Sequence, residues 1–346
     1  MQHRNAIAAA LLIGLAGFAS ACNSTPPAEP AKNQAAAPAP KAITPEERVK
    51  WYQDCWENFN GKKWDEFKKC YAENATSLQL GYGKPSTTGP DAIVGSSIDF
   101  GKSFPDGRGD GQLILVNGPH IAGIYLLKGT NSGPLTSPDG KEMTATNKKF
   151  GLLFGHEIDA DPAALKVIKE IGIMDGGTLG AQLGLVKMPA RPLMAKGEAM
   201  PKIVVAKNDD TEMKNLAAEK AQWDAWNKHD GPAVDMYAAD DSVFHDMSEA
   251  KDQNKTQSSQ FNKDYWKAFS DAKITVSSMW PAGDYVATTG NFEGTNDGDF
   301  PAMKLKKTGK KVSAPYLEID WLEGGKVKEA WLFMDGAMLA AQLGQK

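Results

Sequence analysis

Apolar residues recur along the chain at two spacings, one typical of helices and one typical of strands. Thr44, Pro45 and the two glutamates after them form a helix start, and the helical pattern continues to about Phe59. Alternation of apolar and polar residues, as in 285–289 and 316–320, predicts strands. Because helices come first and a run of antiparallel strands follows, the pattern predicts an α+β fold.

The same order of elements is predicted twice: two helices, a first strand, and four further strands. We expect helices at residues 44–59, 63–72, 210–228 and 232–238, and a short helical tail at 337–343. We expect strands at 76–80, 111–116, 121–128, 148–158 and 167–174, and again at 242–246, 272–279, 285–293, 312–321 and 327–334. A curved sheet wrapped on its helices would enclose one cone-shaped cavity in each half.

Four short motifs recur in the same order in both halves, which indicates a duplicated domain. With the two copies in turn, they are MDGGTLGAQLG at 174–184 and MDGAMLAAQLG at 334–344, GTNSG at 129–133 and GTNDG at 294–298, CYA at 70–72 and MYA at 236–238, and EID at 157–159 and 318–320. The Pro-containing segment 188–207 would be a hinge between a first domain, 44–187, and a second, 208–346.

Residues 1–21 have the pattern of a signal peptide, with a short positive start and an apolar stretch over 7–18. The small residues before Cys22 resemble a lipobox, which implies a lipidated cysteine; ordinary cleavage that leaves an incidental cysteine is the alternative. Asn23 favours the outer over the inner membrane, by resemblance to lipoprotein sorting. Residues 22–43 are rich in Ala and Pro and predict an extended spacer. We therefore expect an exported protein attached to a bacterial membrane through its lipid only.

The composition is that of a globular protein. The 346 residues are 41% hydrophobic and 24% charged, and the net charge of -4 gives no drive toward nucleic acid. No apolar run after the first twenty residues is long enough to span a bilayer. The histidines and cysteines lack metal-ligand spacing, and no phosphate loop or serine elbow occurs. We expect no metal and no cofactor.

Cys55 and Cys70 fall on two successive predicted helices that would pack as a hairpin. In an oxidising compartment they could form a disulfide that closes a loop of about 15 residues. Two buried thiols are the alternative, because the second copy has neither cysteine.

The second half resembles the SnoaL-like (polyketide cyclase-like) family of the nuclear transport factor two-like superfamily. The segments that carry this resemblance are FSD at 269–271, PAGDYVA at 281–287, GTNDG at 294–298 and KVKEAWLFMD at 326–335. The first half keeps FPD at 104–106 and GTNSG at 129–133. The resemblance covers the chain from about residue 45 and implies two tandem cone-shaped α+β barrels, which could pack together as a pseudo-dimer.

The resemblance also implies where a site would lie. In the family's polyketide ester cyclases, a carboxylate at the end of the closing strand acts as acid and base, and this role maps onto Asp335 and, in the first copy, Asp175. His245 matches the His-Asp pair that often ends the first strand, and it is the second candidate catalytic residue. A helix N-cap is the alternative role for the aspartates.

Alternation places Trp331, Phe333 and Asp335 on one face of the closing strand. If that face turned inward, aromatic walls would raise the pKa of the carboxyl. In the first copy, isoleucines replace the two aromatic residues and Gln79 replaces His245, so we expect any working site in the second copy. The remaining candidate ligand-binding residues are Trp226, Asn131, Asn296 and Asp175, with core packing for the tryptophan and turn formation for the asparagines as alternatives.

Two functions follow from these observations. One is a tethered binding module that holds a small apolar molecule or a protein partner in the cavity. The alternative is an ester cyclase- or isomerase-like acid–base enzyme that acts through the second domain without a metal. Asn131 and Asn296 stand where the cyclases commonly show His, and this difference favours the binding module.

Overall fold

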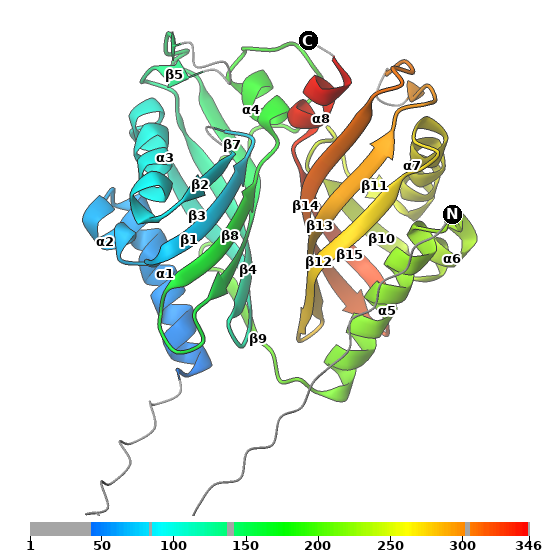
Figure 1. Cartoon of the computed structure of the whole chain (residues 1–346), viewed down its shortest axis with the longest axis horizontal. Helices are drawn as coiled ribbons and strands as arrows, with labels where there is room; N and C mark the ends of the chain where they lie inside the picture. The colour runs from blue at the N-terminus through cyan, green and yellow to red at the C-terminus, as the bar shows by residue number, and fades with distance from the viewer. Residues whose placement is uncertain (1–42, 83–84, 137–141, 302–304, 345–346) are drawn as a thin grey trace, which may run out of the picture. The chain divides into compact units, whose positions relative to one another are not determined.

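The computed structural model describes residues 43–82, 85–136, 142–301 and 305–344, which form two copies of one α+β barrel (Figure 1). In each copy, helices lie against one face of a curved sheet, as the sequence predicts. The predicted signal peptide, the lipidation candidate Cys22 and the spacer up to residue 42 lie outside the described residues. Among the described helices, none is long and apolar enough to cross a membrane.

The first barrel combines a mixed sheet with short helices. Its helices are α1 (Pro45–Asn60), α2 (Trp64–Lys68), α3 (Pro90–Ser103) and α4 (Gly176–Gln182). Its strands lie in the order β2 (Ser86–Thr88), β1 (Tyr71–Leu80), β8 (Val167–Ile173), β7 (Lys149–Ala160), β4 (His120–Thr130), β3 (Arg108–Asn117) and β9 (Lys202–Val205). β1 runs parallel to β8, and the pairs β8–β7, β7–β4 and β4–β3 are antiparallel. A separate pair of antiparallel strands is formed by β5 (Leu135–Thr136) and β6 (Glu142–Met143).

The second barrel repeats this topology, except that it has no counterpart of β9 or of the β5–β6 pair among its described strands. Its helices are α5 (Asp210–Trp226), α6 (Gly231–Met236), α7 (Lys255–Ala268) and α8 (Gly336–Leu343). Its strands lie in the order β11 (Gln253–Asn254), β10 (Ala238–Asp246), β15 (Lys326–Met334), β14 (Lys311–Glu323), β13 (Tyr285–Thr295) and β12 (Lys273–Ala282). Here β10 runs parallel to β15, as β1 does to β8. The shared strand order supports the predicted duplication.

The sequence pattern predicts the start of α1 correctly, but the expected helices do not include α3, α4 or α7. Thr44 and Glu47 form a capping box, in which each side chain accepts a hydrogen bond from the other residue's backbone N–H. Helices α3 and α7, which occupy equivalent places after the first strand of each barrel, are absent from the prediction. α7 buries few apolar side chains, and its start is fixed by a second capping box of Asn254 and Gln257. The predicted helix at 63–72 is also too long, because α2 ends at Lys68 and β1 follows.

Equivalent hydrogen bonds align β7 of the first barrel with β14 of the second. The backbone N–H of Asn131 donates to the carbonyl of Lys148, and that of Asn296 donates to the carbonyl of Lys310, so these strands are related by a shift of 162 residues. The EID match at 157–159 and 318–320, which needs a shift of 161, is therefore not a structural equivalence. With the correct register, the first-barrel counterpart of Glu318 is His156.

Helices α1 and α5 are related by a shift of 167 residues. Asn60 pairs with the backbone of Gly109, and Asn227 makes the same two bonds with the backbone of Ile274. This shift makes Tyr52 the counterpart of Glu219. The pairing of the first strands with the closing strands gives the same shift, which makes Asp246 the counterpart of Gln79. The expected correspondence of Gln79 with His245 is therefore wrong by one residue.

The outer face of each sheet, opposite its helices, is buried in a core that both barrels share. Leu115, Ile173 and Phe333 are fully buried in this cluster, together with Leu317 and Ile319. A Cβ atom added at Gly155 would lie 2.5 Å from the ring of Phe333, so the two barrels pack closely at this point. Sheet strands of both barrels are consequently buried on both faces.

The segment 188–207 is more ordered than a plain hinge. Residues Lys202–Val205 form β9, which pairs in parallel with β3 at the edge of the first sheet. Upstream of β9, the guanidinium of Arg191 donates to the carbonyl of Asp246 and to the carboxylate of Asp252. This segment therefore contacts both barrels through hydrogen bonds.

Cys55 on α1 and Cys70, just before β1, form a disulfide with an S–S distance of 2.04 Å. Both residues are buried in the first core. The equivalent positions in the second barrel carry Gln222 and Tyr237, so the bridge is specific to the first copy.

Candidate functional site

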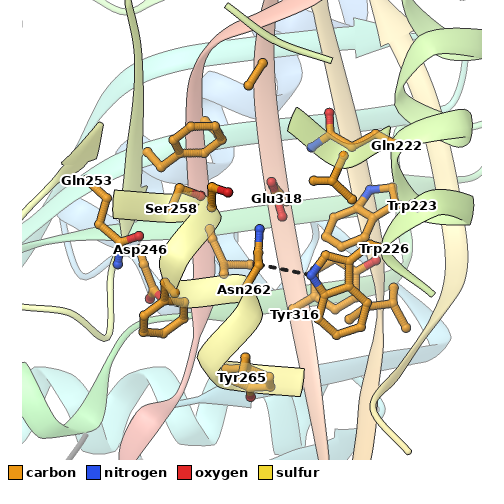
Figure 2. A pocket seen from close by; sticks show the side chains of 18 of the residues that line it. Gln222, Trp223, Trp226, Asp246, Gln253, Ser258, Asn262, Tyr265, Tyr316 and Glu318 are labelled. Atoms are coloured by element: carbon orange, nitrogen blue, oxygen red, sulfur yellow. Dashed lines mark hydrogen bonds between the residues drawn. The ribbon is translucent and has the colours of Figure 1, made fainter. Parts of the chain in front are cut away.

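The second barrel encloses a cavity of about 140 Å³ between its helices and the inner face of its sheet (Figure 2). Trp223 and Trp226 of α5, Tyr265 of α7, Phe292 of β13 and Tyr316 of β14 supply aromatic walls. Ring centroids lie 5.6 Å apart for Trp223 and Tyr316 and 6.4 Å apart for Trp226 and Tyr265. Aromatic side chains from several elements therefore surround one small space.

Three acidic side chains, one of them in the cavity wall, lie in this interior beside other polar residues such as Asp246 and Asn262. Glu318 lines the cavity, where Figure 2 shows it among the aromatic residues, and Glu219 and Asp320 are fully buried. Burial raises the pKa of Glu219 to about 7. Burial and the charge of Glu219 raise the pKa of Glu318 well above its ordinary value, and the same causes with the charge of Glu318 raise that of Asp320. The interior therefore favours the protonated forms of these carboxyls.

Several buried polar atoms around this cavity lack hydrogen-bond partners among the described residues. They are the carboxyl oxygens of Glu219 and Asp320, the amide oxygen of Gln222, the indole N–H of Trp223 and the hydroxyl of Tyr316. The carboxyls of Glu219 and Asp320 are near enough to shift each other's pKa. Unpaired buried polar groups cost free energy, so a bound molecule or water that paired with them would be stabilised.

The first barrel encloses a cavity of about 110 Å³ whose polar side chains are paired with one another. The hydroxyl of Tyr52 lies 2.7 Å from Nδ1 of His156, and Nε2 of His156 lies 3.3 Å from Oε2 of Glu170. The hydroxyl of Tyr71 donates to Oε2 of Glu170 at 3.0 Å, and the amide of Gln79 donates to Oε1 at 3.1 Å. A tyrosine, a histidine and a carboxylate thus form one connected chain of hydrogen bonds.

This chain changes the ionisation of its acid. Burial alone would raise the pKa of Glu170, but the hydrogen bond and charge of His156, with the hydrogen bond from Tyr71, hold it below its ordinary value. Connected phenol, imidazole and carboxylate groups can hold and transfer a proton. The sequence predicts any working site in the second copy, so it does not predict this arrangement.

The closing strand of the second barrel presents the opposite face to the one expected. Ala330, Leu332 and Met334 line the cavity, whereas Phe333 lies in the core shared with the first barrel. Trp331 packs against the same outer cluster. The expected inward orientation of Trp331, Phe333 and Asp335 is therefore wrong. The cause is that the outer face of this sheet is buried too, so an apolar face does not identify the barrel interior.

Asp335 and Asp175 are helix N-caps that also bond across the two barrels. Asp335 accepts hydrogen bonds from the backbone of Ala337 in its own helix and of Gly176 in the first barrel, each at 3.2 Å. Asp175 reciprocates, accepting from Thr178 at 2.6 Å and from Gly336 at 3.1 Å.

The environment of the two caps also affects their ionisation. Burial and the charge of Asp175 raise the pKa of Asp335 to about 6, and burial raises that of Asp175. Neither carboxylate lines a barrel cavity.

His245 borders the second cavity, but its ring is engaged on the outer face of the sheet. Nε2 lies 2.9 Å from Glu329 and Nδ1 lies 2.8 Å from Asp252, and the ring stacks on Trp331. Burial would lower the pKa of His245, but the hydrogen bonds to Glu329 and Asp252 raise it above its ordinary value. The imidazole is thus paired with Glu329 and Asp252 and not with Asp335.

Asn131 and Asn296 brace equivalent loops and do not line the cavities. Asn296 is fully buried, donates to the carbonyls of Ala268 and Gly298, and accepts from the backbone and hydroxyl of Thr308. Asn131 makes the same set of bonds in the first barrel. Among the predicted ligand-binding residues, Trp226 does line the second cavity, with its indole donating to Asn262 at 3.2 Å (Figure 2).

The sequence contains a signal for the acids that the prediction missed. Alternation over 316–320 puts Tyr316, Glu318 and Asp320 on one face and two apolar residues on the other. Because both faces of this strand are buried in the structure, the face that carries the acids is buried as well. The sequence alone does not show that the outer face of the second sheet is buried.

The comparison with protein-family models matches residues 217–343 to the SnoaL-like polyketide cyclase family. The second barrel is a SnoaL-like domain. The match begins within α5, includes α7, β10 and the strands β12–β15 that line the cavity, and ends at the last residue of α8. The comparison with curated proteins gives no match.

About two fifths of this chain matches nearly the whole length of each similar solved structure. AclR from Streptomyces galilaeus is 25% identical, with 38% of this chain and 97% of that chain covered and a TM-score of 0.35. IdmH from Streptomyces antibioticus is 22% identical, with coverage of 38% and 98% and a TM-score of 0.34. TsrD from Streptomyces laurentii is 18% identical, with coverage of 40% and 100% and a TM-score of 0.35.

Proposed function

We propose that the chain is an exported, lipid-anchored protein whose SnoaL-like barrel binds a small, mainly apolar molecule in its cavity. The observation that carries this proposal is the aromatic-walled cavity of about 140 Å³ with unpaired buried polar atoms around it. Ligand sites combine apolar walls with a few polar groups in this way. The acid–base function expected from Asp335 and His245 has less support, since Asp335 does not line the cavity and His245, at its border, is paired with Glu329 and Asp252.

A cavity-filling substitution tests the binding proposal. Ala330 lines the cavity and is 2% exposed, so Ala330→Leu would place extra side-chain atoms where the ligand would sit. Val243→Leu, at a 37% exposed position of the neighbouring strand β10, is the control. The probe is N-phenyl-1-naphthylamine, an uncharged apolar fluorophore. We expect the wild type and Val243→Leu to bind the probe in the second cavity, and Ala330→Leu to have lost that binding site. Equal binding by all three proteins would contradict the proposal.

The tether is tested separately. Cys22→Ala should move the full-length protein from the detergent phase to the aqueous phase of a phase partition, because acyl chains supply the anchoring energy. A wild-type protein that already partitions into the aqueous phase would contradict the lipid anchor.

A second candidate function belongs to the first barrel. The Tyr52–His156–Glu170 chain reaches a cavity and holds an ionised acid beside an imidazole. These are the groups that proton abstraction from a bound substrate requires. His156→Gln should abolish any turnover by this site while leaving the binding of N-phenyl-1-naphthylamine by the second barrel unchanged. A turnover that survives His156→Gln would contradict this assignment.

A further inference from the structure

The two barrel interiors differ most in how their acids are compensated. In the first barrel, His156 stands next to Glu170 and bonds to it. The equivalent position in the second barrel is Glu318, whose neighbours are two more acids, Glu219 and Asp320. The first interior thus contains its own basic partner, whereas the second places three carboxyls together.

The basic side chains nearest to the second cavity are engaged elsewhere. Lys255 borders the cavity, but its ammonium bonds to Asp240 and to the carbonyl of Ala238. His245 bonds to Glu329 and Asp252 on the outer face. In the described part of the chain, no lysine, arginine or histidine forms an ion pair with Glu318. Asp246, the other acid that acts on Glu318, is bonded to Ser248 and adds negative charge.

The aromatic walls complete this arrangement. The rings of Trp223, Trp226, Tyr265 and Tyr316 line the same cavity as Glu318. Aromatic faces attract cations through the ring quadrupole, and rings grouped around a small volume are the usual receptor for substituted ammonium groups. A carboxyl without a basic partner and aromatic rings around one cavity therefore both favour a cation.

We propose that the SnoaL-like barrel binds an organic cation, a substituted ammonium group, with its charge against Glu318 and its alkyl surface against the aromatic walls. This inference rests on the proposed binding function and names the class of ligand. A metal cation fits less well, because no group of three or more His, Cys, Asp or Glu side chains among the described residues is arranged so that it could hold one. A cation would gain the attraction of an ionised Glu318, which a neutral guest would not.

A pair of isosteric probes tests the charge directly. Choline carries a trimethylammonium group, and 3,3-dimethylbutan-1-ol has the same shape without the charge. We expect calorimetry on the full chain at pH 8 to show choline binding at least about tenfold more tightly than the alcohol. Glu318→Gln should abolish this preference. Glu323→Gln, which removes the same charge from an exposed side chain, should keep it.

The pH dependence adds a second readout. A cation favours ionised carboxyls, so its binding releases protons wherever those carboxyls are protonated in the free protein. Choline affinity should therefore rise from pH 5 to pH 8, by up to about tenfold per pH unit for each proton released. The affinity of the alcohol should not rise over this range.

The outcomes separate this inference from the proposed function. Equal binding of choline and the alcohol, or choline binding that survives Glu318→Gln, would overturn the cation proposal. Absence of choline binding by a protein that binds N-phenyl-1-naphthylamine in the second cavity would overturn it too, and would leave the proposed function intact. Failure of that apolar probe would instead count against the proposed function.

Discussion

In the first barrel, a histidine and a tyrosine form hydrogen bonds with the buried acid Glu170. In the second barrel, no basic residue pairs with Glu318 in the described part of the chain. Both interiors are built on the same strand order, and the key side chains occupy equivalent positions: Tyr52 and Glu219 on the first helix, His156 and Glu318 on the fourth long strand. In one barrel the acid Glu170 is held ionised by its neighbours; in the other the acids are driven toward their neutral forms. Two copies of one fold can therefore place differently charged groups in their interiors.

The largest expected effect concerns the core that the barrels share. Phe333 is fully buried and packs against Gly155 of the first barrel. Phe333→Ala should therefore lower the free energy of unfolding by about 3–5 kcal/mol. Ile173→Ala, at the equivalent position of the first barrel, should cost less because fewer atoms are removed. Leu185→Ala, at an exposed position, is the control. Denaturant unfolding measures all three, and a Phe333→Ala cost as small as the control would contradict the shared core.

The disulfide provides the next test, because it belongs to one barrel only. Replacing both Cys55 and Cys70 by Ala should destabilise the first barrel by about 3 kcal/mol, as expected for a loop of 15 residues. Reduction of the wild type should give a similar loss, and it should leave the second barrel's affinity for N-phenyl-1-naphthylamine unchanged. Differential scanning calorimetry can follow the loss. Two free thiols in the unreduced, denatured protein would exclude the bridge.

The pH dependence of stability should have opposite signs in the two barrels. Between the ordinary carboxyl range and about pH 7, folded Glu219 keeps a proton that the unfolded chain has released, so the second barrel loses stability as pH rises. Glu170 has a lowered pKa, so its contribution is present above the unfolded value of 4.5 and is lost as pH falls through the folded value.

Calorimetric melting from pH 5 to pH 8 measures the first of these trends. The loss should be on the order of a few kcal/mol, and Glu219→Gln should flatten the pH profile. Glu323→Gln should not flatten it. A wild-type profile that is level or rises across this range would contradict the raised pKa values of the second interior.

The smallest effects are expected at the two caps. Asp335→Asn and Asp175→Asn should each change stability by less than about 1 kcal/mol, because Asn also caps helices. Neither change should alter the binding of N-phenyl-1-naphthylamine, since both carboxylates lie outside the cavities. Altered probe binding in Asp335→Asn, measured by fluorescence titration, would restore Asp335 as a site residue.

The sequence predicts the duplication and most strands, because the repeated motifs and the alternation are local signals. It misses α7, whose polar sequence relies on a capping box and on packing against the sheet. It also reverses the face of β15, because Phe333 points to a second core that exists only when two barrels meet. The Tyr52–His156–Glu170 chain could not be predicted, since Tyr52 on α1 lies 104 residues before His156 in the β7–β8 hairpin.

The most direct test of the account is a ¹³C NMR titration of the side-chain carboxyls in glutamate-labelled protein, assigned with Glu170→Gln, Glu219→Gln and Glu318→Gln. We predict that Glu170 titrates below the ordinary value of 4.5 and that Glu219 titrates near 7, with Glu318 well above 4.5. Added choline should lower the pKa of Glu318. If all three carboxyls titrate together in the ordinary range, the two interiors are electrostatically alike and the central contrast between the barrels is wrong.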